Sequence, residues 1–158
     1  LQFGADLCHP QDLAVGAETL LVTSAVAVVT MMGVRRTRPL VYGDEAPLSA
    51  RLEGNATLSF PSGHTANAFA ATLVAFHMLR ARHARSAMPW IALGVGGAVS
   101  SGVGVSRVVA GDHFPSDVLA GACIGAAVGL LVPELHRVAP SLTLGPSGNA
   151  ALALSGNF

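Results

Sequence analysis

The stretch V-L-A-G-A-C-I-G-A-A-V-G-L-L-V-P at residues 118–133 decides the fold, because it is uncharged throughout and has a glycine at every fourth position. Gly121, Gly125 and Gly129 form two overlapping G-x-x-x-G spacings, which let the backbones of membrane helices approach closely. In water each glycine inside a helix would cost about 1 kcal/mol relative to alanine, whereas glycine is common in membrane spans. The stretch therefore predicts a membrane helix packed tightly against a neighbour.

Three more apolar stretches precede this one, at residues 13–34, 65–79 and 88–105. Across all four stretches Glu18 is the only acidic or basic residue, whereas an amphipathic helix of a soluble protein has a polar face. A bilayer span needs about 20 residues, and residues 65–79 and 118–133 reach this length only with their polar flanks. A buried bundle in a soluble enzyme is therefore the alternative. We expect an all-α, membrane-embedded helical bundle with about four spans in this chain.

The composition supports a membrane location and argues against nucleic-acid partners. Charged residues make up 11% of the chain, against roughly 25% in an ordinary soluble domain, and the mean hydropathy is +0.55. Nine basic residues balance nine acidic ones, so the chain has no net field that would attract nucleic acid. The two cysteines, Cys8 and Cys123, are too few for a disulfide framework.

The length of 158 residues predicts a single domain over residues 1–158, with its core at 13–133. Residues 134–158 are rich in Gly, Ser, Pro and Asn and predict an irregular C-terminal tail, in which only 150–154 alternates as an edge strand would. The chain begins at Leu1 without a signal-peptide pattern. We therefore expect it to start within a longer protein.

The connectors between the helices predict which helix ends meet. Residues 80–86 read R-A-R-H-A-R-S, with three arginines and no carboxylate, which is typical of a cytoplasmic loop under the positive-inside rule. By alternation, the connectors at residues 35–64 and 106–117 both lie on the opposite side of the membrane. Polar clusters that are far apart in the sequence are thereby expected to face each other.

The first polar cluster is R-R-T-R-P at residues 35–39. The planar guanidinium of arginine matches the geometry of phosphate and can donate two parallel hydrogen bonds to it. The cluster is therefore a candidate phosphate site. A solvated rim or a contact with lipid head groups is the alternative.

The second cluster is F-P-S-G-H-T at residues 60–65, where a loop enters the second helix. Free backbone N–H groups at a helix N-terminus attract anions, which makes Ser62 and Gly63 candidate phosphate ligands. His64 is then expected at the mouth of the site. The alternative is that His64 is a capping or surface residue.

The third cluster is S-R-x5-H-x3-D, which runs from Ser106 to Asp117. If a helix begins near Phe114, a spacing of four puts Asp117 on the same face as His113. The carboxylate would then accept the Nδ1 proton of the histidine and leave Nε2 free to attack. A local His–Asp capping contact is the alternative.

Taken together, R-P at Arg38, P-S-G-H ending at His64 and S-R-x5-H-x3-D ending at Asp117 resemble a known signature. It is the three-part signature of the type 2 phosphatidic acid phosphatase and vanadium haloperoxidase superfamily. The flanking sequences S-F-P-S-G-H-T and D-H-F-P-S-D-V-L-A-G are similar to the integral-membrane branch of that superfamily. Members of this branch usually have six spans, which implies that two N-terminal spans are missing from this chain.

The resemblance also implies a role for each motif residue. His113 would form a phosphohistidine intermediate, Asp117 would orient it, and His64 would protonate the leaving group and then activate water. Because phosphoryl transfer depends mainly on positioning and electrostatic stabilisation, no metal and no cofactor are expected. The phosphoryl oxygens would be held by Arg38, Arg107 and the backbone at Ser62 and Gly63.

One position departs from the family pattern. The signature normally opens with a lysine seven residues before the arginine, and this position is Met31 here. On a continuous helix Met31, Arg35 and Arg38 would share one face. We therefore hypothesise that Arg35 binds the phosphate in place of the missing lysine, whereas Arg36 points elsewhere.

The predicted function is hydrolysis of a lipid or lipid-linked phosphomonoester or diphosphate. The expected partners are the lipid phosphate substrate and the bilayer, and the expected location is the bacterial inner membrane, with the active site facing the periplasm or the cell exterior. One alternative is a vanadate-dependent haloperoxidase, against which the short chain and its apolar helices argue. The other is a non-catalytic protein that binds lipid phosphates, which the methionine at position 31 motivates.

Overall fold

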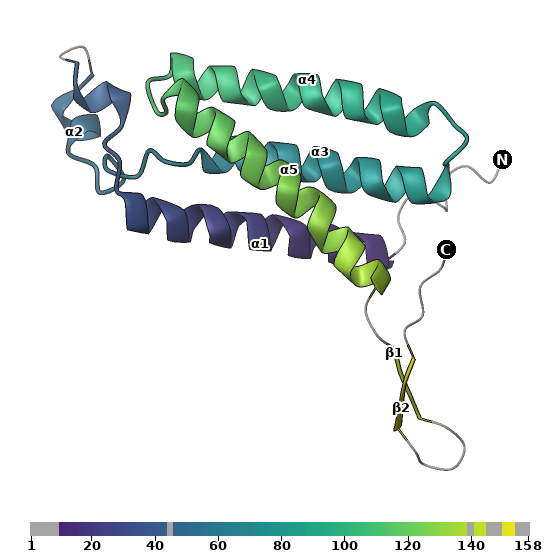
Figure 1. Cartoon of the computed structure of the whole chain (residues 1–158). Coiled ribbons are helices and arrows are strands. Elements are labelled where there is room, and N and C mark those ends of the chain that lie inside the picture. The colour runs from purple at the N-terminus through teal and green to yellow at the C-terminus, as the bar shows by residue number, and fades with distance from the viewer. Residues whose placement is uncertain (1–9, 44–45, 139–140, 145–149, 154–158) are drawn as a thin grey trace.

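The computed structural model describes residues 10–43, 46–138, 141–144 and 150–153, and its main feature is a bundle of long helices (Figure 1). All four apolar stretches form helices at the predicted places, which confirms the helical bundle. The long helices are α1 (Pro10–Val34), α3 (Gly63–Arg82), α4 (Met88–Val109) and α5 (Pro115–Val138).

The connector between α1 and α3 is the longest in the bundle. It carries one 3-10 turn, η1 (Pro39–Val41), and one short helix, α2 (Leu48–Arg51). These elements lie beyond the end of the bundle where α1 finishes and α3 begins (Figure 1). The connector is therefore placed beside the short turn that joins α4 to α5.

Helix α3 is the centre of the bundle, because it packs against α1, α4 and α5. The side chains on its interior face are small, and two of them, Ala66 and Ala70, are fully buried. Two polar side chains of α3 also make hydrogen bonds to neighbouring helices: Asn67 Nδ2 donates to Ser24 Oγ of α1 at 3.0 Å, and Thr72 Oγ1 lies 3.0 Å from Ser100 Oγ of α4. Such interhelical hydrogen bonds are a usual means of association within membranes.

The glycines of residues 118–133 confirm the predicted close packing. A methyl group built on Gly121 would overlap the backbone oxygen of Ser62, and one on Gly125 would overlap that of Ala66. At Gly129 it would lie 2.8 Å from the oxygen of Ala70. The α5 glycines therefore bring two helix backbones into direct contact along the whole of their crossing.

Three of the four long helices are long and apolar enough to cross a membrane. The spans are Pro10–Val41, Met88–Val109 and Pro115–Arg137, and large apolar side chains such as Leu21 (71% exposed) and Val99 (62% exposed) face outward from them. Helix α3 is less apolar than these three, because it carries polar residues inside the bundle, such as Asn67 and Thr72, and arginines in its last turn. Three of the about four expected spans are therefore supported, and the span at α3 stays a prediction.

The C-terminal region differs from the irregular tail predicted for residues 134–158. Helix α5 continues past Pro133 to Val138, where His136 Nε2 lies 2.7 Å from Glu18 Oε2 of α1. An antiparallel hairpin follows, with β1 (Ser141–Leu144) paired to β2 (Ala150–Ala153), so residues 150–153 of the alternating segment form a strand. The prediction ended the core at Pro133, whereas this proline lies inside α5.

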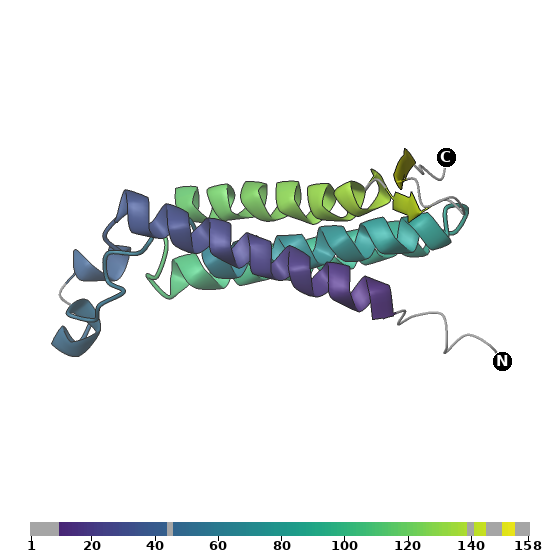
Figure 2. The same cartoon turned by 90° about the horizontal axis from the view of Figure 1, so that it is seen from below.

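The bundle is elongated (Figure 2), and its two ends carry different polar residues. At one end, an ion pair between Arg82 and Asp12 joins α3 to α1, close to the arginine-rich connector between α3 and α4. The opposite end carries the loops with the three predicted polar clusters (Figures 1 and 2). Of the two cysteines, Cys123 is a free thiol, and Cys8 lies outside the described residues.

Candidate active site

The three polar clusters meet at one end of the bundle, as their connectors predicted. Backbone hydrogen bonds join them directly: Ser59 N–H donates to Arg36 O at 2.9 Å, and Ser62 N–H donates to Asp117 O at 2.9 Å. A third bond links Leu40 N–H to Gly111 O at 3.0 Å. The three segments, which are far apart in the sequence, therefore form one continuous backbone framework.

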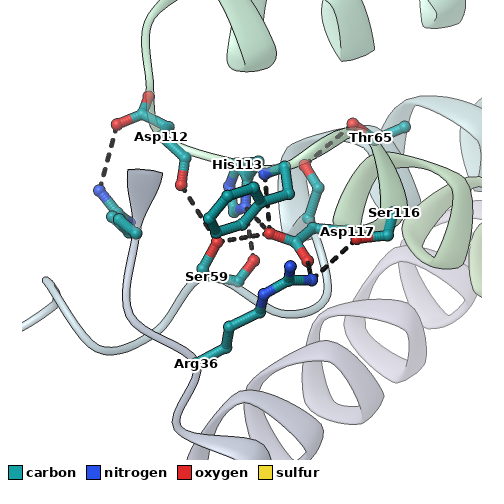
Figure 3. A network of polar contacts seen from close by, with 10 residues as sticks. Arg36, Ser59, Thr65, Asp112, His113, Ser116 and Asp117 are labelled. Carbon is teal, nitrogen blue, oxygen red and sulfur yellow. Dashed lines mark hydrogen bonds and ion pairs between the residues drawn. The ribbon is translucent and has the colours of Figure 1, made fainter. Parts of the chain in front are cut away.

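Asp117 is the centre of the polar network shown in Figure 3. Its carboxylate is fully buried, and each of its oxygens is occupied. Oδ1 accepts from Arg36 Nη1 at 2.6 Å, while Oδ2 accepts from Ser59 Oγ at 2.5 Å and from the backbone N–H of Phe114 at 2.9 Å. The last contact is a capping interaction at the start of α5, so Asp117 fixes the helix that begins directly after His113.

His113 is held by the backbone rather than by the predicted carboxylate. Its Nδ1 lies 2.5 Å from the backbone oxygen of Ser59 but 4.0 Å from Oδ2 of Asp117. The sequence-based geometry was wrong on this point, because His113 precedes α5 and does not lie one helical turn from Asp117. Ser59 serves both residues, since its carbonyl accepts from His113 and its hydroxyl donates to Asp117.

The surroundings of His113 favour its neutral, nucleophilic form. The ring is 3% exposed, and burial lowers the pKa of His113 below its ordinary value, although the Ser59 carbonyl opposes the shift. A carbonyl oxygen can only accept a hydrogen bond, so Nδ1 carries the proton and Nε2 keeps its lone pair. This is the tautomer that a phosphoryl-accepting histidine requires.

The arginine cluster is arranged differently from the helical prediction. Helix α1 ends at Val34, and Arg35 adopts a positive φ of 50°, so Met31, Arg35 and Arg38 do not share a helix face. Arg35 is exposed and makes no side-chain hydrogen bond or ion pair with the described residues. Its proposed contact with phosphate therefore loses its geometric basis and stays a prediction.

Arg36, which the sequence placed away from the site, points into it (Figure 3). Besides its bond to Asp117, Nη1 donates to Ser116 Oγ at 2.8 Å, and the guanidinium lies 4.1 Å from the centre of the Phe114 ring. The end of α1 before Arg35 and the positive φ of that residue cause the difference, because they end the helical periodicity on which the prediction rested.

Arg38 and Arg107 converge on a single carboxylate. Arg38 Nη1 lies 3.2 Å from Oδ1 of Asp112, and Arg107 Nη1 lies 3.5 Å from Oδ2. The Nε of Arg38 is buried and has no hydrogen-bond partner within the part of the chain that the structure describes. Buried donors are nearly always paired in folded proteins, so this nitrogen is a candidate donor to a bound anion.

The loop at residues 60–65 fits only part of its predicted role. Ser62 is fully buried, its N–H already donates to Asp117 O, and its hydroxyl lies 2.9 Å from Thr65 Oγ1. Ser62 is therefore engaged in holding α3 to α5, and its N–H is not free for phosphate as the sequence had suggested. Gly63 opens α3, and a methyl group at this position would lie 3.2 Å from the Cε of Met31.

This contact locates the position where the family pattern has lysine. The tip of residue 31 reaches the start of α3, beside the candidate phosphate site. A methionine there brings a thioether and no charge. The charge that a lysine at position 31 would supply is therefore absent from the candidate phosphate site itself, and not from a remote surface.

His64 lies in the first turn of α3 and is exposed. It forms no hydrogen bond or ion pair with any described residue, so its side chain is accessible from solvent at the same end of the bundle as His113. Among the described residues, no group of three or more His, Cys, Asp or Glu side chains is placed to hold a metal ion.

Sequence reasoning missed three residues of this network: Arg36, Ser59 and Asp112. Arg36 was excluded by an assumed helix. Ser59 directly precedes the cluster at residues 60–65, and Asp112 lies within the cluster at residues 106–117. This closeness to the motif residues is the sequence signal that could have identified them.

Comparisons with known proteins find relatives of this chain. A family model described as the PAP2 superfamily matches residues 13–140. Over 116 residues the chain is 39% identical to a lipid A 1-phosphatase of Porphyromonas gingivalis, which covers 73% of this chain and 23% of that protein. It is 32% identical over 114 residues to a decaprenylphosphoryl-5-phosphoribose phosphatase of Mycobacterium tuberculosis, covering 72% and 55%.

A solved structure is also similar. The crystal structure of a transmembrane PAP2-type phosphatidylglycerolphosphate phosphatase from Bacillus subtilis matches with a TM-score of 0.55 and 26% identity, covering 80% of this chain and 67% of that one. The chain spans between about a quarter and just over half of the length of the two phosphatases above. With a family model over most of its length and a transmembrane protein as its solved relative, the chain belongs to the PAP2 superfamily, in its transmembrane branch.

Proposed function

We propose that this chain is the catalytic part of a membrane phosphatase that hydrolyses a phosphomonoester or diphosphate carried by a lipid. The family, the membrane helices and the convergence of the three motifs support this function. The single observation that carries it is the buried Nε of Arg38, which has no hydrogen-bond partner among the described residues and lies in the arginine pair beside the neutral, buried His113.

In the first step, Nε2 of His113 attacks the phosphorus atom while the bond from phosphorus to the leaving oxygen breaks. The tautomer held by the Ser59 carbonyl supplies the lone pair. His64, exposed in the first turn of α3, would give its proton to the departing oxygen. Arg38 and Arg107 would stabilise the charge on the phosphoryl oxygens.

In the second step, water attacks the phosphorus atom and the bond to Nε2 breaks. His64, now neutral, takes the proton of the attacking water, so inorganic phosphate leaves and both histidines return to their initial states. Asp117 does not touch the reacting atoms. It keeps Ser59, Arg36 and the start of α5 in place around His113.

The substrate class follows from the relatives. Lipid A and a decaprenylphosphoryl-5-phosphoribose are named as substrates of two of them, and the site opens at the end of a bundle whose apolar helices face outward. We therefore infer a lipid substrate whose phosphate reaches the loops at the membrane surface. A haloperoxidase function has no specific observation in its favour.

We further infer that the site faces the periplasm or cell exterior of a bacterium, with the connector at residues 80–86 in the cytoplasm. The support is that the connector carries three arginines and no carboxylate of its own and lies at the end of the bundle opposite to the site. A cysteine at Ser86, in a background where Cys8 and Cys123 are replaced, should resist an impermeant thiol reagent in intact cells. Rapid labelling would invert the topology.

The function is tested by release of inorganic phosphate from detergent-solubilised lipid phosphates, including phosphatidic acid, phosphatidylglycerophosphate and a polyprenyl diphosphate. We expect release from at least one of them and its loss in His113→Ala. Activity that survives in His113→Ala, or no release from any lipid, would refute the proposal. Halide oxidation in the presence of vanadate, measured on the same preparation, would identify the alternative chemistry.

A further inference from the structure

We propose that Asp112 is a positioning residue that holds Arg38 and Arg107 together as one phosphate-binding unit. The inference rests on the proposed phosphatase function but concerns a residue outside the three motif positions that carry the chemistry. Its evidence is the geometry of the carboxylate between the two guanidinium groups.

Asp112 connects segments that are otherwise independent. Arg38 follows the end of α1, whereas Arg107 lies in the last turn of α4. Each oxygen of the Asp112 carboxylate faces a different arginine, at 3.2 Å for Arg38 and 3.5 Å for Arg107. Two cations that would repel each other are thus brought to one place by a single shared anion.

The contacts leave most of each guanidinium available. Arg38 uses only Nη1 for Asp112, and its Nε is buried without a partner in the described structure. Arg107 likewise uses Nη1 for Asp112, and its Nε donates to Ser106 Oγ at 3.5 Å. Since each arginine has five N–H donors, the remaining ones can bind a phosphate while the carboxylate keeps the two side chains aligned.

Asp112 is also fixed relative to the nucleophile. It directly precedes His113, and the backbone N–H groups of both residues donate to Arg107 O, at 3.1 and 3.3 Å. The backbone oxygen of Asp112 faces the hydroxyl of Ser59 at 3.4 Å. The carboxylate therefore sets the arginines at a defined place beside the attacking ring, before substrate arrives.

Preorganisation of this kind affects binding and rate together. Without the carboxylate, both long side chains regain rotamer freedom, which must be lost again when phosphate binds. A small misplacement of a group that acts in the transition state can reduce the rate by up to about a hundredfold. Asp112→Asn should therefore lower kcat/KM by roughly tenfold, although the variant keeps the size of the side chain.

The experiment compares Asp112→Asn with the parent in detergent, using phosphatidic acid or whichever lipid the parent hydrolyses. Vanadate, which mimics the transition state of phosphoryl transfer, should inhibit the variant roughly tenfold more weakly. Glu134→Gln is the matched control, because Glu134 is an ion-paired carboxylate on α5 that contacts Arg137 at 3.2 Å, far from the site. The control should stay within twofold of the parent in both measurements.

A second comparison separates positioning from general damage. In an Arg107→Ala background, assayed with radiolabelled substrate, Asp112→Asn should cause a clearly smaller loss than it does in the parent. An equal loss in both backgrounds, or a variant within twofold of the parent in kcat/KM and vanadate inhibition, would overturn the inference. If the parent itself releases no phosphate, the proposed function fails instead, and vanadate-induced thermal stabilisation of parent and variant still tests the role of Asp112.

Discussion

Replacing Arg36 with alanine removes one of the three donors to a fully buried carboxylate. The bond from Arg36 Nη1 to Asp117 Oδ1 is 2.6 Å long, and the Asp117 side chain has no exposure to solvent. Breaking a buried ion pair by removing one partner costs about 3–5 kcal/mol. The Arg36 side chain is 37% exposed, however, and fully exposed pairs contribute only about 0–1 kcal/mol.

An intermediate cost of about 1–2 kcal/mol is therefore expected. If this energy is lost from the transition state, the rate falls by about tenfold, since 1.36 kcal/mol corresponds to one factor of ten. Ser59 and the Phe114 N–H still hold Oδ2, so complete inactivation is not expected. Arg36→Lys should lie between parent and alanine variant, because it keeps the charge but loses the planar group that covers Phe114.

The assay is release of inorganic phosphate under kcat/KM conditions, together with thermal unfolding in detergent. Arg35→Ala is the matched control, since Arg35 is adjacent, exposed and without a side-chain partner among the described residues. We expect Arg36→Ala to lose more activity than Arg35→Ala, the reverse of the order that a continuous helix would give. An Arg36→Ala variant within twofold of the parent, or a larger loss in Arg35→Ala, would refute the reasoning.

Three further predictions follow from the packing, the buried histidine and the missing lysine. Gly125→Ala should destabilise the bundle, because a methyl group there overlaps the Ala66 backbone. Gly97→Ala, where a methyl group would have nothing within 4 Å, should instead stabilise the bundle by up to about 1 kcal/mol. Thermal unfolding that ranks the two variants the other way would contradict the packing. Since the pKa of His113 is lowered, the acid limb of kcat/KM, corrected for substrate ionisation, should lie below about pH 6.5, while the need for a protonated His64 gives the alkaline limb. An acid limb above pH 7 would argue against a neutral nucleophile. Met31→Lys should strengthen competitive inhibition by inorganic phosphate severalfold, because residue 31 reaches the start of α3 and lysine would bring a positive charge there. Unchanged inhibition would place residue 31 outside the phosphate site.

The helices and their packing could be predicted because they depend on simple patterns. Apolar stretches with almost no charge became helices, and glycines four apart marked the face where α5 meets the α3 backbone. The meeting of the three motifs also followed from alternation of the spans. These features depend on composition and spacing, which a single sequence displays directly.

The detailed contacts of the site could not be predicted in the same way. A helix that ends in a left-handed residue is usually marked by glycine, but arginine occupies this position at residue 35, so the end of α1 was hidden. Ser59 acts on His113 through a backbone carbonyl, which every residue possesses. Asp112 gains its contacts only once the ends of α1 and α4 are brought together.

The central claim is that His113 carries the phosphoryl group during turnover. The most direct measurement uses His64→Ala with an activated aryl phosphate labelled with ³²P, because a good leaving group needs little protonation while hydrolysis of the intermediate is slowed. After an alkaline quench, which preserves phosphohistidine, peptide mapping should find the label on His113, and His113→Ala should carry none. Label on another residue, or steady phosphate release with no labelled protein at any time point, would contradict the account.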